Sequence, residues 1–227
     1  TFEKLDGSYD VFISVGGDGT ILQSVNFIRN RDIPILGINT GRLGFLATVN
    51  KEDIRHTIKL LLNNKYKISE RSLLSIRVNP KVEELFDNHY ALNEIAVSRK
   101  NTTSMITVDT WLDEEYLTAY WADGLIISTP TGSTGYSLSC GGPVVTPATK
   151  ALVITPIAPH NLNARPLVIK DNTKITLKVS GRADDYLVSM DSRIATLKNN
   201  TTVTIQKAPF KLKMIEFTED TFLKTLR

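Results

Sequence analysis

The sequence predicts an α/β, Rossmann-like N-terminal domain followed by a β-rich, β-sandwich-like C-terminal domain. Two observations lead to this fold class. An apolar run at residues 11–15, a glycine corner and a helical pattern are followed by a second apolar run at residues 33–38. After Lys65, short apolar or alternating runs separated by turn residues replace the helical spacing. Strands that alternate with helices indicate a parallel sheet, whereas successive short strands indicate a sandwich or a barrel.

The composition is that of a globular chain. Its 227 residues, 41% of them hydrophobic, suffice for a sizeable core in one large domain or two small ones. Lys and Arg (27) only slightly outnumber Asp and Glu (24), which argues against a nucleic-acid binder. The single cysteine, Cys140, excludes an intramolecular disulfide, and we find neither a membrane-length apolar stretch nor a signal peptide. We therefore expect a reducing compartment, the cytoplasm, and no membrane partner.

The residues VFISVGGDGTIL at 11–22 form the corner around which the N-terminal domain is expected to be built. Its apolar start predicts a buried parallel strand that ends at Gly16 and Gly17, which permit φ > 0 and a close approach of ligand to backbone. A helical spacing from Thr20 leaves free N–H groups at the helix start, which favours a bound anion. Asp18 would then bind Mg²⁺ or accept a proton from a hydroxyl, and both are kinase roles.

The corner alone leaves alternatives open, because Asp-Gly is also a common turn dipeptide. It is not a Walker loop, since no Gly-Lys-Ser/Thr follows, and it is not GxGxxG. Residues 33–38 predict a second buried strand, and the glycine-containing loop at 39–45 is expected at the same sheet edge, as a second wall of the site. Asn50 is expected to cap a helix over residues 51–64.

The C-terminal half is predicted to be built from short strands. We place them at residues 68–78, 90–97, 106–112, 116–121, 125–128, 152–157, 175–179, 186–190 and 203–205. The only helical break among them is expected near residues 133–140, and a last strand and a short helix are expected at 210–217 and 219–226. The expected domains are an α/β domain at 1–66, a β-rich nucleotide-binding domain at 67–206, and a C-terminal segment at 207–227 that can return to the α/β domain.

Three polar segments interrupt the apolar strands of this half. Asn93 and Glu94 offer an amide and a carboxylate that could read a base edge and a ribose diol, although an exposed strand face explains them equally well. The Ser/Thr/Gly-rich segment at 128–142 is interpreted as a ligand loop in which Tyr136 offers a stacking face. Residues 190–193 are either part of the site or a hairpin turn.

These segments carry a specific resemblance. The sequences GGDGTIL at 16–22, GRLGFL at 41–46, LNE at 92–94, DGLIISTPTGSTGYSLSCGGP at 123–143 and TPIAPHNLNARPLVI at 155–169 together resemble the NAD kinase family of bacterial type. The match covers residues 11–193 in order. GGDGT by itself is shared with lipid kinases and resembles 6-phosphofructokinases, so the long Ser/Thr/Gly segment joined to LNE is the more specific feature.

The resemblance implies phosphorylation of the 2′-hydroxyl of the adenosine ribose of NAD, giving NADP. ATP or another phosphoryl donor, Mg²⁺ or another divalent metal, and a homodimer or homotetramer are implied with it. Asp18 matches the proposed proton acceptor, and no side chain is assigned to the metal. The implied substrate-binding positions are Gly19, Asn93, Glu94, Asp123, Thr134, Gly135, Tyr136, Ser137, Leu138, Ser139, Ala158, Asp191 and Arg193.

The chain departs from the family pattern in several places. Trp121 stands where many relatives carry Arg, and Gly135 and Ser104 replace a frequent Ala and an occasional His. Relatives also carry a strand and a helix before the corner, so the α/β domain is expected to be truncated here. His160 is interpreted as structural. Two alternative functions remain: a non-catalytic NAD(P) or nucleotide sensor on the same fold, and a GGDGT lipid kinase, which would need an apolar lipid pocket.

Overall fold

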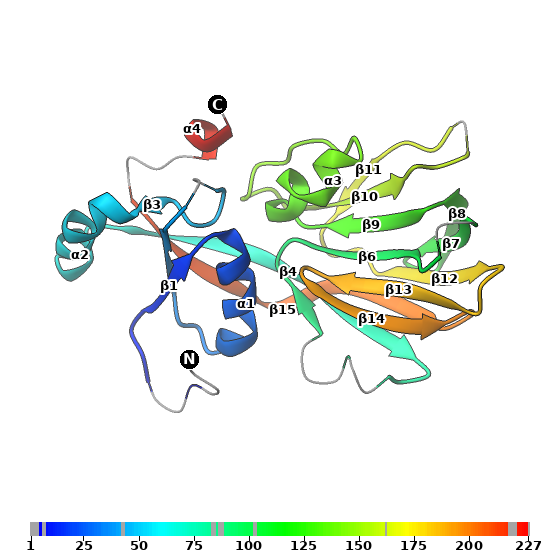
Figure 1. The fold of residues 1–227 in the computed structure, drawn as a ribbon, viewed down its shortest axis with the longest axis horizontal. Coiled ribbons are helices and arrows are strands. Elements are labelled where there is room, and N and C mark those ends of the chain that lie inside the picture. The colour runs from blue at the N-terminus through cyan, green and yellow to red at the C-terminus, as the bar shows by residue number, and fades with distance from the viewer. Residues whose placement is uncertain are drawn as a thin grey trace. The chain divides into compact units, whose positions relative to one another are not determined.

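The computed structural model describes residues 5, 8–41, 44–82, 85, 89–101, 104–161, 163–217 and 222–226. The chain forms two compact units, which are described separately: residues 1–71 with 210–227, and residues 72–209 (Figure 1). The long strands β4 (Lys67–Asn79) and β15 (Thr202–Glu216) each contribute to both units.

The first unit is built on a small parallel sheet. Strand β1 (Phe12–Gly16) pairs in parallel with β2 (Ile35–Asn39), and β2 pairs in parallel with β3 (Val49–Asn50). Strand β15 pairs in parallel with β2 at the edge opposite β1, where Met214 pairs with Ile35. The helices of this unit are α1 (Asp18–Ile28), the short 3-10 helix η1 (Lys51–Asp53) that leads into α2 (Ile54–Leu62), and α4 (Phe222–Leu226).

Glycine lets the corner between β1 and α1 close tightly. Gly16 has a φ of 153°, and a Cβ there would lie 2.2 Å from Oγ1 of Thr20. Gly37 of β2 lets α1 approach the sheet, because a Cβ at that position would lie 2.6 Å from Cδ1 of Ile21 and 3.0 Å from Cα of Ala47. Either site would accept a side chain only with displacement of its neighbours.

Two expectations for this unit are wrong in detail. Strand β1 is parallel, but it is not buried: Ile13 is 43% and Val15 58% exposed. These two side chains lie two residues apart and therefore share one face of the strand, and that face is exposed, whereas Ser14 on the opposite face is 4% exposed. The single helix expected over residues 51–64 is divided into η1 and α2 and ends at Leu62, which is 78% exposed. Leu60 and Leu61 pack on the hydrophobic cluster that includes Leu36 and Ile38 of β2.

The second unit is β-rich and mostly antiparallel. One sheet has the order β11-β10-β9-β6-β13-β14, and its strands lie side by side in Figure 1. The bounds are Leu167–Lys170 for β11, Ala151–Ile157 for β10, Gly124–Ser128 for β9, Glu94–Arg99 for β6, Asp185–Met190 for β13 and Arg193–Lys198 for β14. The 3-10 helix η3 (Thr131–Thr134) and α3 (Tyr136–Ser139) follow β9, where the sequence predicts a helical break.

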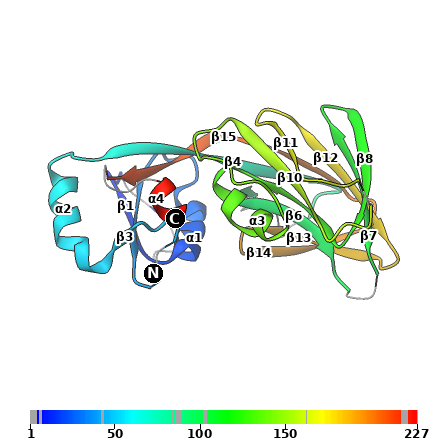
Figure 2. The same ribbon diagram turned by 90° about the horizontal axis from the view of Figure 1, so that it is seen from above.

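The other sheet of this unit joins the first part of β15 to β12 (Ile175–Gly181), β7 (Ile106–Leu112) and β8 (Glu115–Ala122). Strands β7 and β8 form a long hairpin (Figure 2). The short β5 (Tyr90–Ala91) pairs with the second half of β4.

Period-two burial places the core of this unit between its sheets. In β12 the fully buried side chains Ile175, Leu177 and Val179 alternate with more exposed residues, as a half-buried strand requires. Strand β9, in contrast, is buried at every position, from Gly124 to Ser128. The predicted fold class, an α/β domain followed by a β-rich domain, is confirmed.

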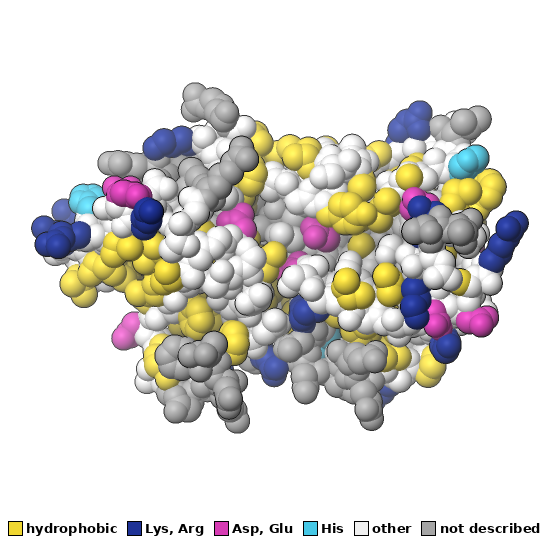
Figure 3. Space-filling view, in the orientation of Figure 1, with side chains coloured by type: hydrophobic (Ala, Val, Ile, Leu, Met, Phe, Trp, Pro, Cys, Tyr) yellow, Lys and Arg dark blue, Asp and Glu magenta, His cyan; other side chains and the backbone are white. Residues whose placement is uncertain are grey.

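On the face drawn in Figure 3, basic and acidic side chains are interspersed.

Candidate active site

In the first unit, Asp18 holds the loop that follows β2. Its Oδ2 accepts a hydrogen bond from the N–H of Phe45 at 2.9 Å, and its Oδ1 accepts from Leu46 at 3.1 Å and from Ala47 at 2.9 Å. A Cβ at Gly44 would lie 2.3 Å from Oδ1, so glycine is needed where this loop passes the carboxylate. The prediction that this loop stands beside the GGDGT corner is confirmed, although Arg42 and Leu43 lie outside the described residues.

In the second unit, the Asp191 carboxylate holds the segment between β5 and β6 through backbone hydrogen bonds. Its Oδ2 accepts from the N–H of Leu92 at 2.9 Å, and its Oδ1 accepts from Asn93 at 2.9 Å and from Glu94 at 3.1 Å. In return, the N–H of Asp191 donates to the carbonyl of Glu94 at 3.0 Å. Asp191 sits at the β13–β14 turn with a φ of 51°. Of the two interpretations left open for residues 190–193, the hairpin turn is therefore confirmed, and the same turn carries this contact.

The Ser/Thr/Gly loop packs directly on Asn93 and Glu94. A Cβ at Gly132 would lie 2.1 Å from the carbonyl oxygen of Asn93, and one at Gly135 would lie 3.1 Å from Oε2 of Glu94. The carbonyl of Asn93 also accepts the N–H of Thr129 at 2.9 Å. Glycine at 132 is therefore required by a close backbone approach and not by chain flexibility.

Burial and charge strongly perturb Glu94. Removal from water raises the pKa of its carboxyl group from 4.5 to about 7, and the neighbouring Asp191 carboxylate adds to the rise, while a hydrogen bond from the Tyr136 backbone N–H opposes it. Its Oε2 is buried without a hydrogen-bond partner among the described groups. Burial likewise raises the pKa of Asp191, against its three backbone hydrogen bonds and Arg193.

We expect Glu94→Gln to stabilise the protein more at pH 8 than at pH 5. The folded-state pKa of about 7 exceeds the ordinary value of 4.5, so the folded protein binds this proton more tightly. Stability is therefore lost as the pH rises from 4.5 to 7, a loss of about 2–3 kcal/mol that glutamine does not suffer. Urea unfolding at both pH values measures the difference. Glu115→Gln on exposed β8 is the control, and an equal pH response in both variants would refute the assignment.

The other predicted residues of this unit surround the same cluster. Tyr136 is 46% exposed, and burial, Cys140, Asp123 and Glu94 all raise the pKa of its phenol. Ser137 is buried, and its hydroxyl lies 2.8 Å from that of Thr155, whereas Leu138 is 43% exposed.

Further polar contacts fix the neighbouring predicted positions. The Asp123 carboxylate forms an ion pair of 2.9 Å with Arg99. The Arg193 guanidinium donates to the carbonyl of Tyr90. Ala158 has a φ of 45°, directly after Ile157, whose carbonyl accepts the N–H of Asp123 at 2.9 Å. Thr134 ends η3, and its hydroxyl donates to the carbonyl of Thr131 at 3.3 Å.

The predicted residues thus fall into two groups. Asp18 and Gly19 belong to the first unit, whereas all the others belong to the second. Within the second unit, hydrogen bonds join Asn93 and Glu94 to Asp191, and the loop that includes Tyr136 packs on them. Ser139 is exposed at the end of α3.

Trp121 and His160 form an exposed pair outside the predicted site residues. Their rings lie 4.9 Å apart between centroids, and the N–H of His160 donates to the carbonyl of Trp121 at 2.8 Å. Trp121 is 49% exposed. The interpretation of His160 as a structural residue agrees with this backbone contact.

Sequence reasoning missed the residues that support the loop from behind. Thr129 is fully buried, and its hydroxyl donates to the carbonyl of Leu92 at 2.6 Å and accepts the N–H of Gly132 at 3.1 Å. The Ser133 hydroxyl binds both backbone groups of Val145. A Ser or Thr in a glycine-rich segment is the only sequence signal for such a role, and it does not tell a loop-supporting hydroxyl from a ligand-binding one.

The described residues do not form a protein-held metal centre. Among them, no group of three or more His, Cys, Asp or Glu side chains is arranged to hold an ion. Both oxygens of Asp18 already accept backbone hydrogen bonds. This donor set does not fit a resident metal ion bound by protein ligands alone.

The first unit has a glycine corner that favours an anion. The second unit has a loop that packs beside an amide, a carboxylate and an exposed aromatic ring. These features are typical of a nucleotide-binding phosphotransferase. Family models described as the ATP-NAD kinase N-terminal domain and the ATP-NAD kinase C-terminal domain match residues 1–66 and 92–217. The chain belongs to the NAD kinase family, and it is an enzyme that phosphorylates NAD.

Curated relatives agree with this assignment. The NAD kinase of Christiangramia forsetii is 68% identical over 226 residues, which are 100% of this chain and 77% of the relative. The NAD kinase of Flavobacterium psychrophilum is 66% identical over 99% of this chain and 76% of its own length. Neither supports a lipid kinase or a sensor.

Solved structures show the same fold. Yeast NADH kinase in complex with NADH has a TM-score of 0.86 and 28% identity, over 96% of this chain and 64% of the yeast chain. An NAD kinase from Archaeoglobus fulgidus in complex with ATP has a TM-score of 0.79 and 31% identity, over 93% of this chain and 79% of the other. No helix among the described residues is long and apolar enough to cross a membrane.

Proposed function

We propose that the chain transfers a phosphoryl group from ATP to the 2′-hydroxyl of the adenosine ribose of NAD, with Asp18 as the proton acceptor. The observation that carries this proposal is the cluster in the second unit. There Asp191 fixes Asn93 and Glu94 through three backbone hydrogen bonds, beside the loop of Tyr136. An amide, a carboxylate and an exposed aromatic ring in one cluster suit an adenosine ligand.

In this proposal each group of the cluster has one task. The Asn93 amide binds the edge of the adenine base, and the Glu94 carboxylate accepts hydrogen bonds from the ribose hydroxyls. Tyr136, which is 46% exposed, stacks on a ring, and residues 134–139 enclose the nucleoside with small hydrogen-bonding groups. Asp123, held by Arg99, and Ala158 line the same region.

The chemistry at Asp18 follows from its hydrogen bonds. A carboxylate has about four lone-pair sites, and three of those of Asp18 accept N–H bonds from residues 45–47. The remaining site can take the proton of the 2′-hydroxyl as the hydroxyl oxygen forms a bond to the γ-phosphorus of ATP. The bond between the γ-phosphorus and the β,γ-bridging oxygen breaks in the same step, and ADP leaves. The free N–H groups at the start of α1, including that of Gly19, favour the phosphate charge.

A divalent metal is part of the proposal only as a companion of the nucleotide. Mg²⁺ is commonly bound through substrate phosphates and few protein carboxylates, and when bound it would neutralise charge on the transferred phosphoryl group. Because the described donors do not fit a resident ion, we assign no step to a metal ligand of this chain.

The donor and acceptor are supported by what the solved relatives bind. The Archaeoglobus fulgidus enzyme was solved with ATP, and the yeast enzyme with NADH. We further propose that the chain acts in the cytoplasm, which its single free cysteine, Cys140, permits, and that it assembles as a homodimer or homotetramer. Light scattering after size-exclusion chromatography tests the assembly.

A coupled assay tests the proposed reaction. We expect NAD, ATP and Mg²⁺ to yield a product that an NADP-specific dehydrogenase accepts, and we expect no phosphorylation of 2′-deoxy-NAD, which lacks the acceptor hydroxyl. Diacylglycerol and sphingosine serve as the lipid controls. Binding of NAD without product from either donor, ATP or polyphosphate, would contradict the proposed reaction, as would phosphorylation of the deoxy analogue.

A further inference from the structure

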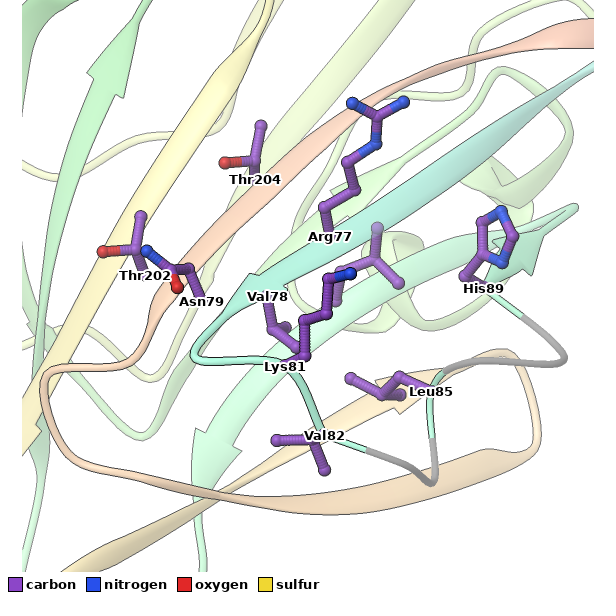
Figure 4. A pocket seen from close by; sticks show the side chains of 10 residues that line it. Arg77, Val78, Asn79, Lys81, Val82, Leu85, His89, Thr202 and Thr204 are labelled. Atoms are coloured by element: carbon purple, nitrogen blue, oxygen red, sulfur yellow. The ribbon is translucent and has the colours of Figure 1, made fainter.

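The second unit contains a cleft that none of the predicted site residues line. It has a volume of about 490 Å³ and lies between the end of β4, the segment that follows it, and the start of β15 (Figure 4). A volume of this size is within the range of small-molecule sites, which run from about 300 to 1,000 Å³. The cleft belongs entirely to residues 72–209, so it is a property of one compact unit.

One part of the cleft is apolar and continuous with the main core. Ile76 and Leu85 are 2% and 5% exposed and belong to the core cluster, and Val78 and Val82 pack against that cluster. All four line the cleft. A hydrocarbon chain or a ring placed here would remove the remaining exposed surface of Val78 and Val82 from water, which is favourable by about 25 cal/mol per Å² of apolar surface buried.

The other part of the cleft is basic. Arg77, Lys81 and His89 line it together with hydroxyls from β15, and none of its described lining residues is acidic. Figure 4 shows these three side chains on one side of the cleft, opposite the threonines of β15. Arg77 is exposed on β4. An arginine fork can bind a carboxylate or a phosphate through two parallel hydrogen bonds.

We propose that this cleft binds a small amphipathic anion, namely a carboxylate or phosphate attached to a short apolar chain or ring. The anionic group contacts Arg77, and the apolar body lies on the partly buried Val78 and Val82. Thr202 and Thr204 offer hydroxyl donors to the same group. The site is separate from the cluster around Asp191, so its ligand is not the adenosine part of NAD.

Isothermal titration of the purified chain with octanoate tests the proposal. We expect saturable binding with a Kd on the order of 1 mM. Acetate, which lacks the apolar body, and octylamine, which carries the opposite charge, should not compete, whereas octyl phosphate should. Arg77→Gln should weaken octanoate binding about tenfold, as loss of a charge-assisted contact requires. Val82→Phe, which reduces the volume of the cleft, should weaken it as well.

Matched variants keep the test decisive. Arg182→Gln removes an exposed arginine elsewhere in the same unit and should leave the Kd unchanged. Absence of saturable binding, competition by octylamine, or equal effects of Arg77→Gln and Arg182→Gln would overturn the proposal.

Discussion

Replacement of Asp18 by asparagine is expected to lower kcat by about 10²–10⁴-fold while NAD still binds. A carboxylate that accepts the hydroxyl proton contributes a factor of this size, and an amide cannot accept that proton at neutral pH. Steady-state kinetics of NADP formation measure kcat, and NAD titration monitored by calorimetry measures binding. Asp53→Asn, which removes the same charge from the exposed 3-10 helix η1, should retain full activity.

The contacts of Asp18 make a second, structural effect of this change predictable. Asparagine can still accept from Leu46 and Ala47 through its oxygen, but its amide N–H group would face the N–H of Phe45. Loss of that hydrogen bond should reduce stability by about 1–2 kcal/mol. Loss of NAD binding by the same factor as kcat would show that Asp18 acts only by holding the loop.

Gly44→Ala perturbs the position of Asp18 while it keeps the charge. The new Cβ would lie 2.3 Å from Oδ1 of Asp18, so the carboxylate must move although its charge remains. If Asp18 accepts the proton, its position matters, because catalytic groups act at hydrogen-bond distance from the reacting atom. We therefore expect kcat to fall in Gly44→Ala with NAD affinity retained.

Much of the fold could be predicted because the relevant signals are local. The glycines that signal the corner and the period-two apolar pattern that signals strands such as β12 can each be recognised from a few consecutive residues. The exposure of one face of β1 could not be predicted in this way. Whether Ile13 and Val15 are covered depends on which elements pack on that face of the sheet, and an apolar composition does not contain that information.

The site was predictable in its residue types but not in its contacts. Asp191 and Leu92 are 99 positions apart, and only the pairing of β13 with β6 brings them together. The raised pKa of Glu94 also depends on burial, which a single sequence does not reveal. The resemblance to NAD kinases named the positions, whereas the structure shows that Asp191 contacts the backbone of its neighbours.

Asp18 and Asp191 use the same device in different units. Each carboxylate accepts the backbone N–H groups of three successive residues, 45–47 in one unit and 92–94 in the other. Three such acceptors fix the path of a loop that has no regular secondary structure, because each N–H group would otherwise need water or another partner. We infer that both loops are held in position before any substrate arrives.

Replacement of Asp191 by alanine is therefore expected to have the largest effect on stability, with a loss of about 3 kcal/mol. The backbone N–H groups of Leu92, Asn93 and Glu94 would all lose their acceptor, and Leu92 is fully buried. The KM for NAD should rise at least tenfold, because Asn93 and Glu94 lose their fixed positions. Urea unfolding and steady-state kinetics measure the two effects.

Asp185→Ala at the start of β13 is the control, because the Asp185 carboxylate pairs with the side chains of Lys100 and Lys198. That change should cost much less stability than Asp191→Ala, because exposed ion pairs contribute little. Asp191→Asn adds a test specific to charge. It removes the second cause of the raised Glu94 pKa, so the loss of stability that arises from Glu94 as the pH rises should end at a pH below about 7. Because burial is the larger cause, the folded-state pKa should stay above 4.5 and part of the loss should remain. A loss that still ends at about 7 would show that Asp191 does not act on Glu94 electrostatically.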